Sequence, residues 1–105
     1  MSRVAYKSIL RSTVMSVHQV NARWLASTLV QEKVKGRIIW EDIVDTFELN
    51  NHPEAKHCFA WSIDTAAGTM VLTALKIAPV ISPQTAVHEA FVQGKMNPKR
   101  ILPKK

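Results

Sequence analysis

The sequence predicts a single α+β domain with an N-terminal helical region, a three-stranded antiparallel sheet, a C-terminal helix and a basic tail. Three observations support this fold class. Residues 1–35 contain no glycine or proline and repeat apolar side chains at a helical period. Residues 57–77 have the pattern of a β-hairpin, and residues 82–94 carry the start and stop signals of a helix.

The first 35 residues are predicted to be mainly helical, with a break near Asn21. Asn21 is a favourable helix N-cap, so we expect a second helix over 22–35. Cations near its end suit the helix dipole, and Gly36 is placed to stop it. The apolar positions that give the helical period are Tyr6, Leu10, Val14, Val17, Val20, Trp24, Leu25 and Leu29.

Residues 37–49 fit two structures. Their apolar side chains share one helical face, with Glu41, Asp45 and Glu48 opposite, where they would form a solvated face. The segment is also rich in β-branched and aromatic residues, which favour strands. We predict a strand, with a helix as the alternative.

The hairpin over 57–77 has two apolar faces. In its first strand Phe59, Trp61 and Ile63 face one way, and the smaller Cys58, Ala60 and Ser62 face the other. A sheet with no polar face must be covered on both sides, by helices or by a second protein. We therefore expect an apolar sheet face to bind a partner, through Phe59, Trp61, Ile63, Val71 and Leu75.

The C-terminal helix is the clearest local signal. Ser82 is an N-cap, Pro83 suits the first helical position and Gly94 follows the last turn, so the helix is predicted over 83–93. We assign residues 1–94 to the domain and residues 95–105 to a basic, mobile tail.

The single cysteine, Cys58, excludes an intrachain disulfide, which favours a reducing compartment and a cytoplasmic location. Residues 1–31 lack acidic side chains, a composition that overlaps with mitochondrial transit peptides and leaves targeting as an alternative. No run of about 18 apolar residues exists, so we expect no membrane-spanning helix.

The sequence offers little chemistry. It has no Walker A, GxGxxG, GxSxG or HExxH motif, so we expect no enzyme, no catalytic residues and no cofactor. We expect no metal site either, because the adjacent His57 and Cys58 would point to opposite faces of a strand, away from a shared ion with His52. The one enzymatic hypothesis pairs Cys58 with His88, although burial would raise the pKa of the thiol.

Charge is concentrated at the two ends of the chain. The net charge is +6, with basic residues in 1–37 and 95–105 and an acidic segment over 38–54. Basic ends of this kind can follow a phosphate backbone. The candidate residues for nucleic-acid binding are Arg3, Lys7, Arg11, Lys99, Arg100, Lys104 and Lys105.

The sequence therefore predicts a small non-enzymatic interaction module that self-associates or binds a protein partner through an apolar sheet face. Three alternatives stay open. The basic ends could bind nucleic acid without sequence preference. A pocket beside Trp61 and Phe59 could hold a small molecule, and Cys58 with His88 could form a reactive pair.

Overall fold

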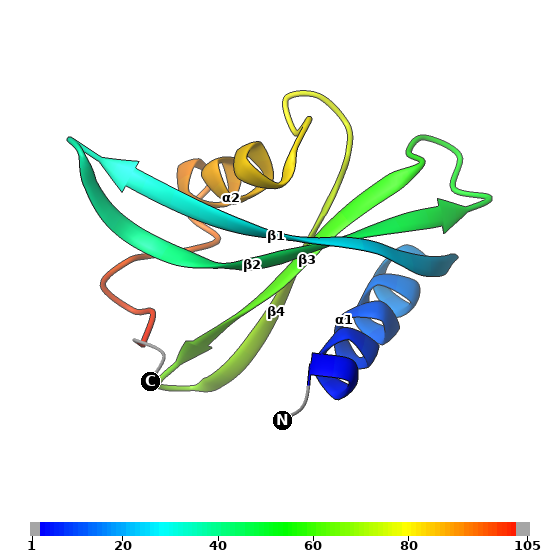
Figure 1. The fold of residues 1–105 in the computed structure, drawn as a ribbon, viewed down its shortest axis with the longest axis horizontal. Coiled ribbons are helices and arrows are strands. Elements are labelled where there is room, and N and C mark those ends of the chain that lie inside the picture. Colours follow the sequence, from blue (N-terminus) through cyan, green and yellow to red (C-terminus); the bar gives the residue numbers. More distant parts are fainter. Residues whose placement is uncertain (1–2, 103–105) are drawn as a thin grey trace.

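The computed structural model describes the backbone of residues 3–102 and the side chains of residues 6–102. It confirms an α+β fold in which one helix precedes an antiparallel sheet in the sequence and another follows it. The sheet has four strands rather than the three predicted. Consecutive strands are neighbours, so the sheet is a meander (Figure 1). The elements are α1 (Arg3–His18), β1 (Asn21–Val34), β2 (Arg37–Asn50), β3 (His57–Thr65), β4 (Gly68–Leu75) and α2 (Pro83–Val92).

The predicted second helix over 22–35 is wrong, because this segment is strand β1 and pairs with β2 along its length. Pairing with β2 provides hydrogen-bond partners for the backbone groups that point toward it, and this long-range pairing outweighs the local preference for a helix. Asn21 begins the strand rather than capping a helix. Lys35 and Gly36, with φ of 52° and 79°, form the two-residue turn to β2. Two consecutive positive φ angles are typical of a type I′ hairpin turn.

The predicted strand over 37–49 is confirmed as β2. Its apolar residues serve both faces of the sheet. Trp40 and Val44 belong to the core beside α2, whereas Phe47 and Leu49 belong to the core beneath α1. A strand buried on both faces has no simple alternation of apolar and polar residues, which is why its sequence also resembled a helix.

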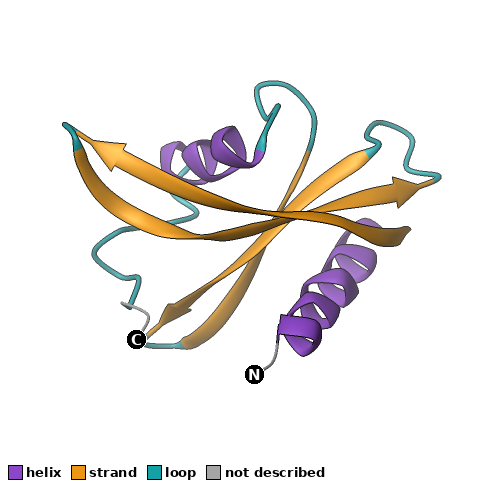
Figure 2. Cartoon of the chain, viewed as in Figure 1, coloured by secondary structure: helices purple, strands orange, loops and turns teal. Residues whose placement is uncertain are grey.

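One helix covers each face of the sheet (Figure 2). Leu10 and Val14 of α1 pack on the face with small β3 residues, among them Cys58 and Ala60. The opposite core, which we call the α2 core, joins Ala86, Val87 and Ala90 to bulky sheet residues. Those sheet residues are Val30, Trp40, Val44, Phe59, Trp61, Ile63 and Leu72. The chain thus covers both apolar faces with its own helices.

Helix α2 begins where the sequence predicts. The Ser82 side chain accepts a hydrogen bond from the Thr85 backbone N–H, and the Thr85 hydroxyl bonds back to the Ser82 backbone. This capping box satisfies backbone donors that the first turn would otherwise leave unpaired. The helix ends at Val92, and Gly94 follows with φ of 75°.

The segment expected as a mobile tail is packed on the domain as far as Leu102. Met96 is buried in the α2 core, and Ile101 packs against that core. Ile101 also forms a β-bridge with Thr65, and the Leu102 N–H donates to the Asp64 carbonyl at 2.7 Å. Lys104 and Lys105 lie outside the described residues.

The two hairpins of the sheet diverge. Strands β1 and β2 pair along their length, but β2 pairs with β3 only from Asp45↔Ala60 to Glu48↔His57. The β1–β2 hairpin therefore continues past β3 as a two-stranded arm, over residues 28–44 (Figure 1).

Candidate interaction site

The structure separates the five residues expected to form a partner-binding face. Phe59, Trp61 and Ile63 are buried in the α2 core. Val71 and Leu75 lie on the other face and pack against the core beneath α1. These residues thus form no common surface, and the chain's own helices occupy both sheet faces. A surface that could accept a partner has to lie at the edges of the sheet instead.

Strand β4 presents such an edge. In the described part of the chain β4 pairs with β3 and with no other strand, so its outer side is open to pairing except at Leu75, whose carbonyl accepts a hydrogen bond from the Ile77 N–H at 2.8 Å. Its sequence, Gly-Thr-Met-Val-Leu-Thr-Ala-Leu, has no charge and no proline, and its pairing with β3 has no register shift. Charges, prolines and bulges are the usual devices that block edge pairing. The opposite edge strand, β1, has Arg23, Glu32 and Lys33 and two register shifts. Of the two edges, β4 is therefore the one open to another strand.

The hydrogen-bond pattern indicates which β4 groups point outward. Lys76 N–H donates to the His57 carbonyl at 2.9 Å, which places this pair among those that bond across β3 and β4. Bonded and non-bonded pairs alternate along an antiparallel ladder. By this alternation, the backbone groups of Val71 and Thr73 point away from β3.

A cleft with a volume of about 260 Å³ runs along this edge. Residues 72–75 of β4 line it, with Trp61 behind them and His18 of α1 at one side. The other wall belongs to α2 and the residues around it: Val80, Ala86, Glu89, Ala90, Gln93 and Lys95. The cleft therefore combines an open strand edge with an apolar wall and a few polar groups at the rim.

His18 links α1 to the same strand. Its Nε2 lies 3.0 Å from the Thr73 Oγ1, and its ring lies edge-on to His52 with the centroids 6.2 Å apart. Partial burial, and then the charge of His52, lower the pKa of His18 below its ordinary value of 6.5. The ring is therefore neutral at pH 7 and places no charge on the cleft.

The Cys58–His88 pair is not assembled. Cys58 lies in the core beneath α1, where desolvation raises the pKa of its thiol from 9.0 to about 12. His88 lies on α2, across the sheet, and its Nδ1 is 2.7 Å from Glu32 Oε2. The expected rise in the thiol pKa is confirmed, and it suits a structural cysteine rather than a nucleophile. Among residues 3–102, no three His, Cys, Asp or Glu side chains lie close enough to share a metal ion.

Sequence reasoning missed a polar contact that fastens α2 to the arm. Glu32 is buried and pairs with His88, and Gln84 Nε2 donates to the Gln31 carbonyl at 2.6 Å. We call the two contacts the α2 clasp. The contact was missed because residues 22–35 were predicted to be a helix, whereas in β1 the Glu32 side chain points toward α2.

The acidic face expected over 37–49 is also corrected. Asp45 is fully buried rather than solvated. Its carboxylate accepts hydrogen bonds from the Trp24 indole N–H, at 3.1 Å, and from the Ser27 hydroxyl. A buried carboxylate requires such donors, so Asp45 is a structural link between β1 and β2.

The basic residues expected to bind nucleic acid do not form one described patch. The Lys7 ammonium lies 3.7 Å from the centroid of the Trp24 ring, and Arg11 Nε donates to the Ala22 carbonyl at 2.6 Å. Both cations therefore help to fasten α1 to β1. Lys99 and Arg100 are exposed near the end of the described chain. The Arg3 side chain, Lys104 and Lys105 lie outside the described residues.

Comparison with known proteins returned no matching family model, curated protein or solved structure. No helix within residues 3–102 is long and apolar enough to cross a membrane.

Proposed function

We propose that this chain is a small protein-interaction module that binds an extended segment of another protein as an added strand along β4. The observation that carries this proposal is the outer edge of β4, which is unpaired, uncharged and unbulged, at the floor of the cleft beside α2. Strand addition draws affinity from main-chain hydrogen bonds and specificity from pockets that receive alternate side chains.

The cleft indicates which segment would fit. A strand paired with residues 71–75 would direct the side chain opposite Thr73 toward α1, and the side chains on either side of it toward α2. The α2 side is formed by Trp61, Leu72 and Ala90, so apolar residues suit these two positions. The cleft is also lined by one anion and one cation, Glu89 and Lys95, so a charged residue of either sign would find a partner there.

A separate partner suits this edge better than a second copy of the chain. The chain has a net charge of +6 and would repel its own kind at close approach. Beside each helix the core of the sheet is buried within one chain, so these two cores require no symmetry mate. Self-association through two β4 edges is an outcome that the experiment below distinguishes.

The test starts from a peptide library displayed on phage and selected on the wild-type protein. We expect enriched peptides with alternating apolar residues, and we expect their synthetic versions to shift the amide resonances of residues 71–75. The variant Thr73→Pro removes the outward N–H and spares the bonds to β3, which is the arrangement that an edge strand tolerates. We expect it to weaken binding at least about tenfold, the effect of about 1.4 kcal/mol.

The matched control is Thr73→Val, which also loses the contact with His18 but keeps the backbone N–H. Equal affinity of the proline and valine variants would refute strand addition, as would peptide-induced shifts outside β4. If the proline variant does not fold, strand addition is tested by hydrogen exchange of the wild-type protein. A bound strand must slow the exchange of the Thr73 amide proton. A dimer at tens of micromolar in light scattering, with Thr73 protected in the absence of peptide, would show self-association instead.

A further inference from the structure

We propose that the tip of the β1–β2 arm contacts double-stranded DNA by entering the major groove as a two-stranded ribbon. We define the tip as residues 33–38, Lys-Val-Lys-Gly-Arg-Ile, all of which are exposed. This proposal is independent of the β4 edge, because the tip belongs to the other hairpin.

The positive charge of the tip is not neutralised by neighbouring side chains. Within the described structure Lys33, Lys35 and Arg37 make no side-chain hydrogen bond or ion pair. Among the described residues, neither of the acidic groups that flank the tip, Glu32 and Glu41, forms an ion pair with its cations. Glu32 is buried and pairs with His88, and Glu41 accepts a hydrogen bond from Gln31. The three cations are therefore available to phosphate groups.

The tip carries cations on both faces. Lys33 pairs with Ile38 and Val34 pairs with Arg37, and successive strand residues point to opposite faces. Each face thus holds one cation and one apolar side chain, with Lys35 in the turn. A flat membrane would meet only one face of such a ribbon, whereas a groove presents phosphates on both sides. The major groove of B-DNA, about 12 Å wide, admits a two-stranded ribbon.

The apolar residues of the tip fit the same setting. Val34 and Ile38 are 50% and 51% exposed, although each is a β-branched side chain with no polar group. In the major groove such side chains can contact the methyl group of thymine. Because the contact is small and the cations bind phosphates, we expect weak sequence preference.

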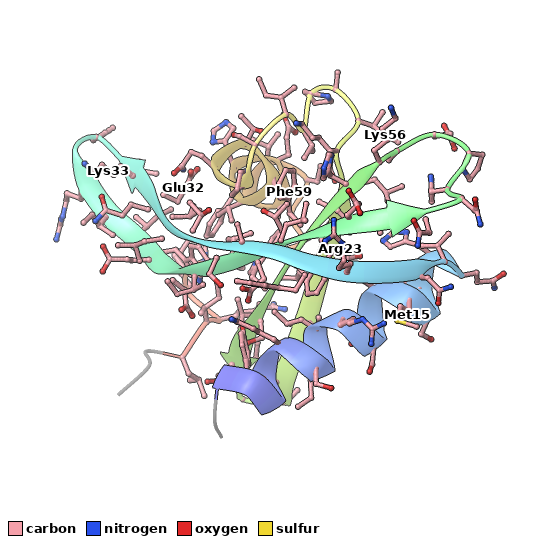
Figure 3. The ribbon with its side chains drawn as sticks, turned by 45° about the vertical axis from the view of Figure 1, so that its right-hand side comes forward. Met15, Arg23, Glu32, Lys33, Lys56 and Phe59 are labelled. Carbon is pink, nitrogen blue, oxygen red and sulfur yellow. The ribbon has the colours of Figure 1, made fainter. Side chains whose placement is uncertain are left out.

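The fold places the turn of the tip at the free end of the arm. Among the described residues no strand pairs with the β2 side of the arm past the short β2–β3 pairing, although Ile38 lines a cavity of about 360 Å³ together with Pro98 and Ile101. Lys33 lies near the free end of the arm (Figure 3). Glu32, next to it, points back toward α2, and the α2 clasp fastens the arm directly behind the tip. The ribbon is therefore presented in a fixed orientation, which lowers the entropic cost of binding.

The experiment measures fluorescence anisotropy of a labelled random-sequence DNA duplex of about 20 base pairs, over a range of salt concentrations. The variant Lys33→Gln, Lys35→Gln, Arg37→Gln is compared with the control Lys56→Gln, Lys76→Gln, Lys95→Gln, which removes three exposed cations elsewhere. We expect the tip variant to bind at least about tenfold more weakly at low salt. Its slope of log affinity against log salt should fall by about 2.7, the effect of three lost phosphate contacts. We expect the control to keep most of the wild-type affinity and slope.

Three results would overturn the proposal. The first is no binding of the duplex by the wild type at low salt, and the second is an equal loss in both triple variants. The third is tighter binding to single-stranded DNA of the same length, or to vesicles rich in phosphatidylserine, than to the duplex. Circular dichroism checks that both variants fold, which we expect because all six side chains are exposed. If the tip variant does not fold, duplex-induced shifts of the amides of residues 33–38 in the wild type decide the question.

Discussion

The buried thiol of Cys58 should make the chain less stable at alkaline pH. Desolvation beneath α1 raises its pKa from 9.0 to about 12. Below pH 9 the thiol is protonated in both the folded and the unfolded state, so it has no effect on the free energy of unfolding. Above pH 9 only the unfolded state loses the proton, and stability falls until the folded pKa is reached. At pH of about 10.5 the loss is about 2 kcal/mol, since each pH unit above the unfolded pKa is worth about 1.36 kcal/mol.

The assay is urea unfolding in reductant at pH of about 7.5 and about 10.5, for the wild type and for Cys58→Ala. The alanine variant loses side-chain packing at both pH values. It also has no thiol, so the effect of the thiol on stability at high pH is absent from it. We expect the wild type to lose about 2 kcal/mol more than the variant between the two pH values, a shift of about 1 M in the urea midpoint. All other side chains are the same in both proteins, so their contributions cancel in this difference. Losses that agree within about 0.5 kcal/mol would refute the assigned burial of the thiol.

Three further predictions concern local structure. Gly36→Ala should cost about 1 kcal/mol in urea unfolding, because the turn residue has φ of 79°; Gly36→Asn should cost less, and equal costs would argue against a left-handed turn. Ser82→Ala should lower stability by about 1 kcal/mol through loss of the capping box, and an unchanged melting temperature would contradict that role. His88→Ala should destabilise by about 1–2 kcal/mol, because it removes the partner of the buried Glu32 carboxylate. The added change Glu32→Gln should recover part of that loss, and no recovery would show that the carboxylate is not the cause.

Local signals predicted the parts of the fold that local interactions determine. Helix α2 begins at Pro83 because Ser82 and Thr85 cap it, and all three residues lie within four consecutive positions. The prediction of a helix in place of strand β1 was wrong for the opposite reason. Its leucines at helical spacing suggested a helix, and only the ladder with β2, a long-range interaction, makes the segment a strand. The Lys35–Gly36 pair was assigned to a helix end although it also fits a two-residue hairpin turn.

The candidate site could not be predicted for a different reason. Sequence alternation predicted correctly that Phe59 and Trp61 share an apolar face, but whether such a face is open depends on where the helices pack. An edge depends on strand order, which no residue of β4 encodes by itself. Strand β4 becomes an edge because the chain turns away after it, with the Val80 N–H bonded to the Ile77 carbonyl, and enters α2 instead of a fifth strand.

The short β2–β3 pairing accounts for both proposed surfaces. The two hairpins diverge from this pairing, and α2 bridges them on one face by packing against Val30 and Trp40 of one and Trp61 and Leu72 of the other. The tip of the arm and the outer edge of β4 therefore belong to different hairpins, and both lie outside the core that the hairpins share. Binding at one should therefore leave the other unaffected. We expect Thr73→Pro to bind duplex DNA as the wild type does, and the tip variant to keep its affinity for the selected peptides. A change of more than about tenfold in either cross-test would show that the arm and the β4 edge form one coupled site.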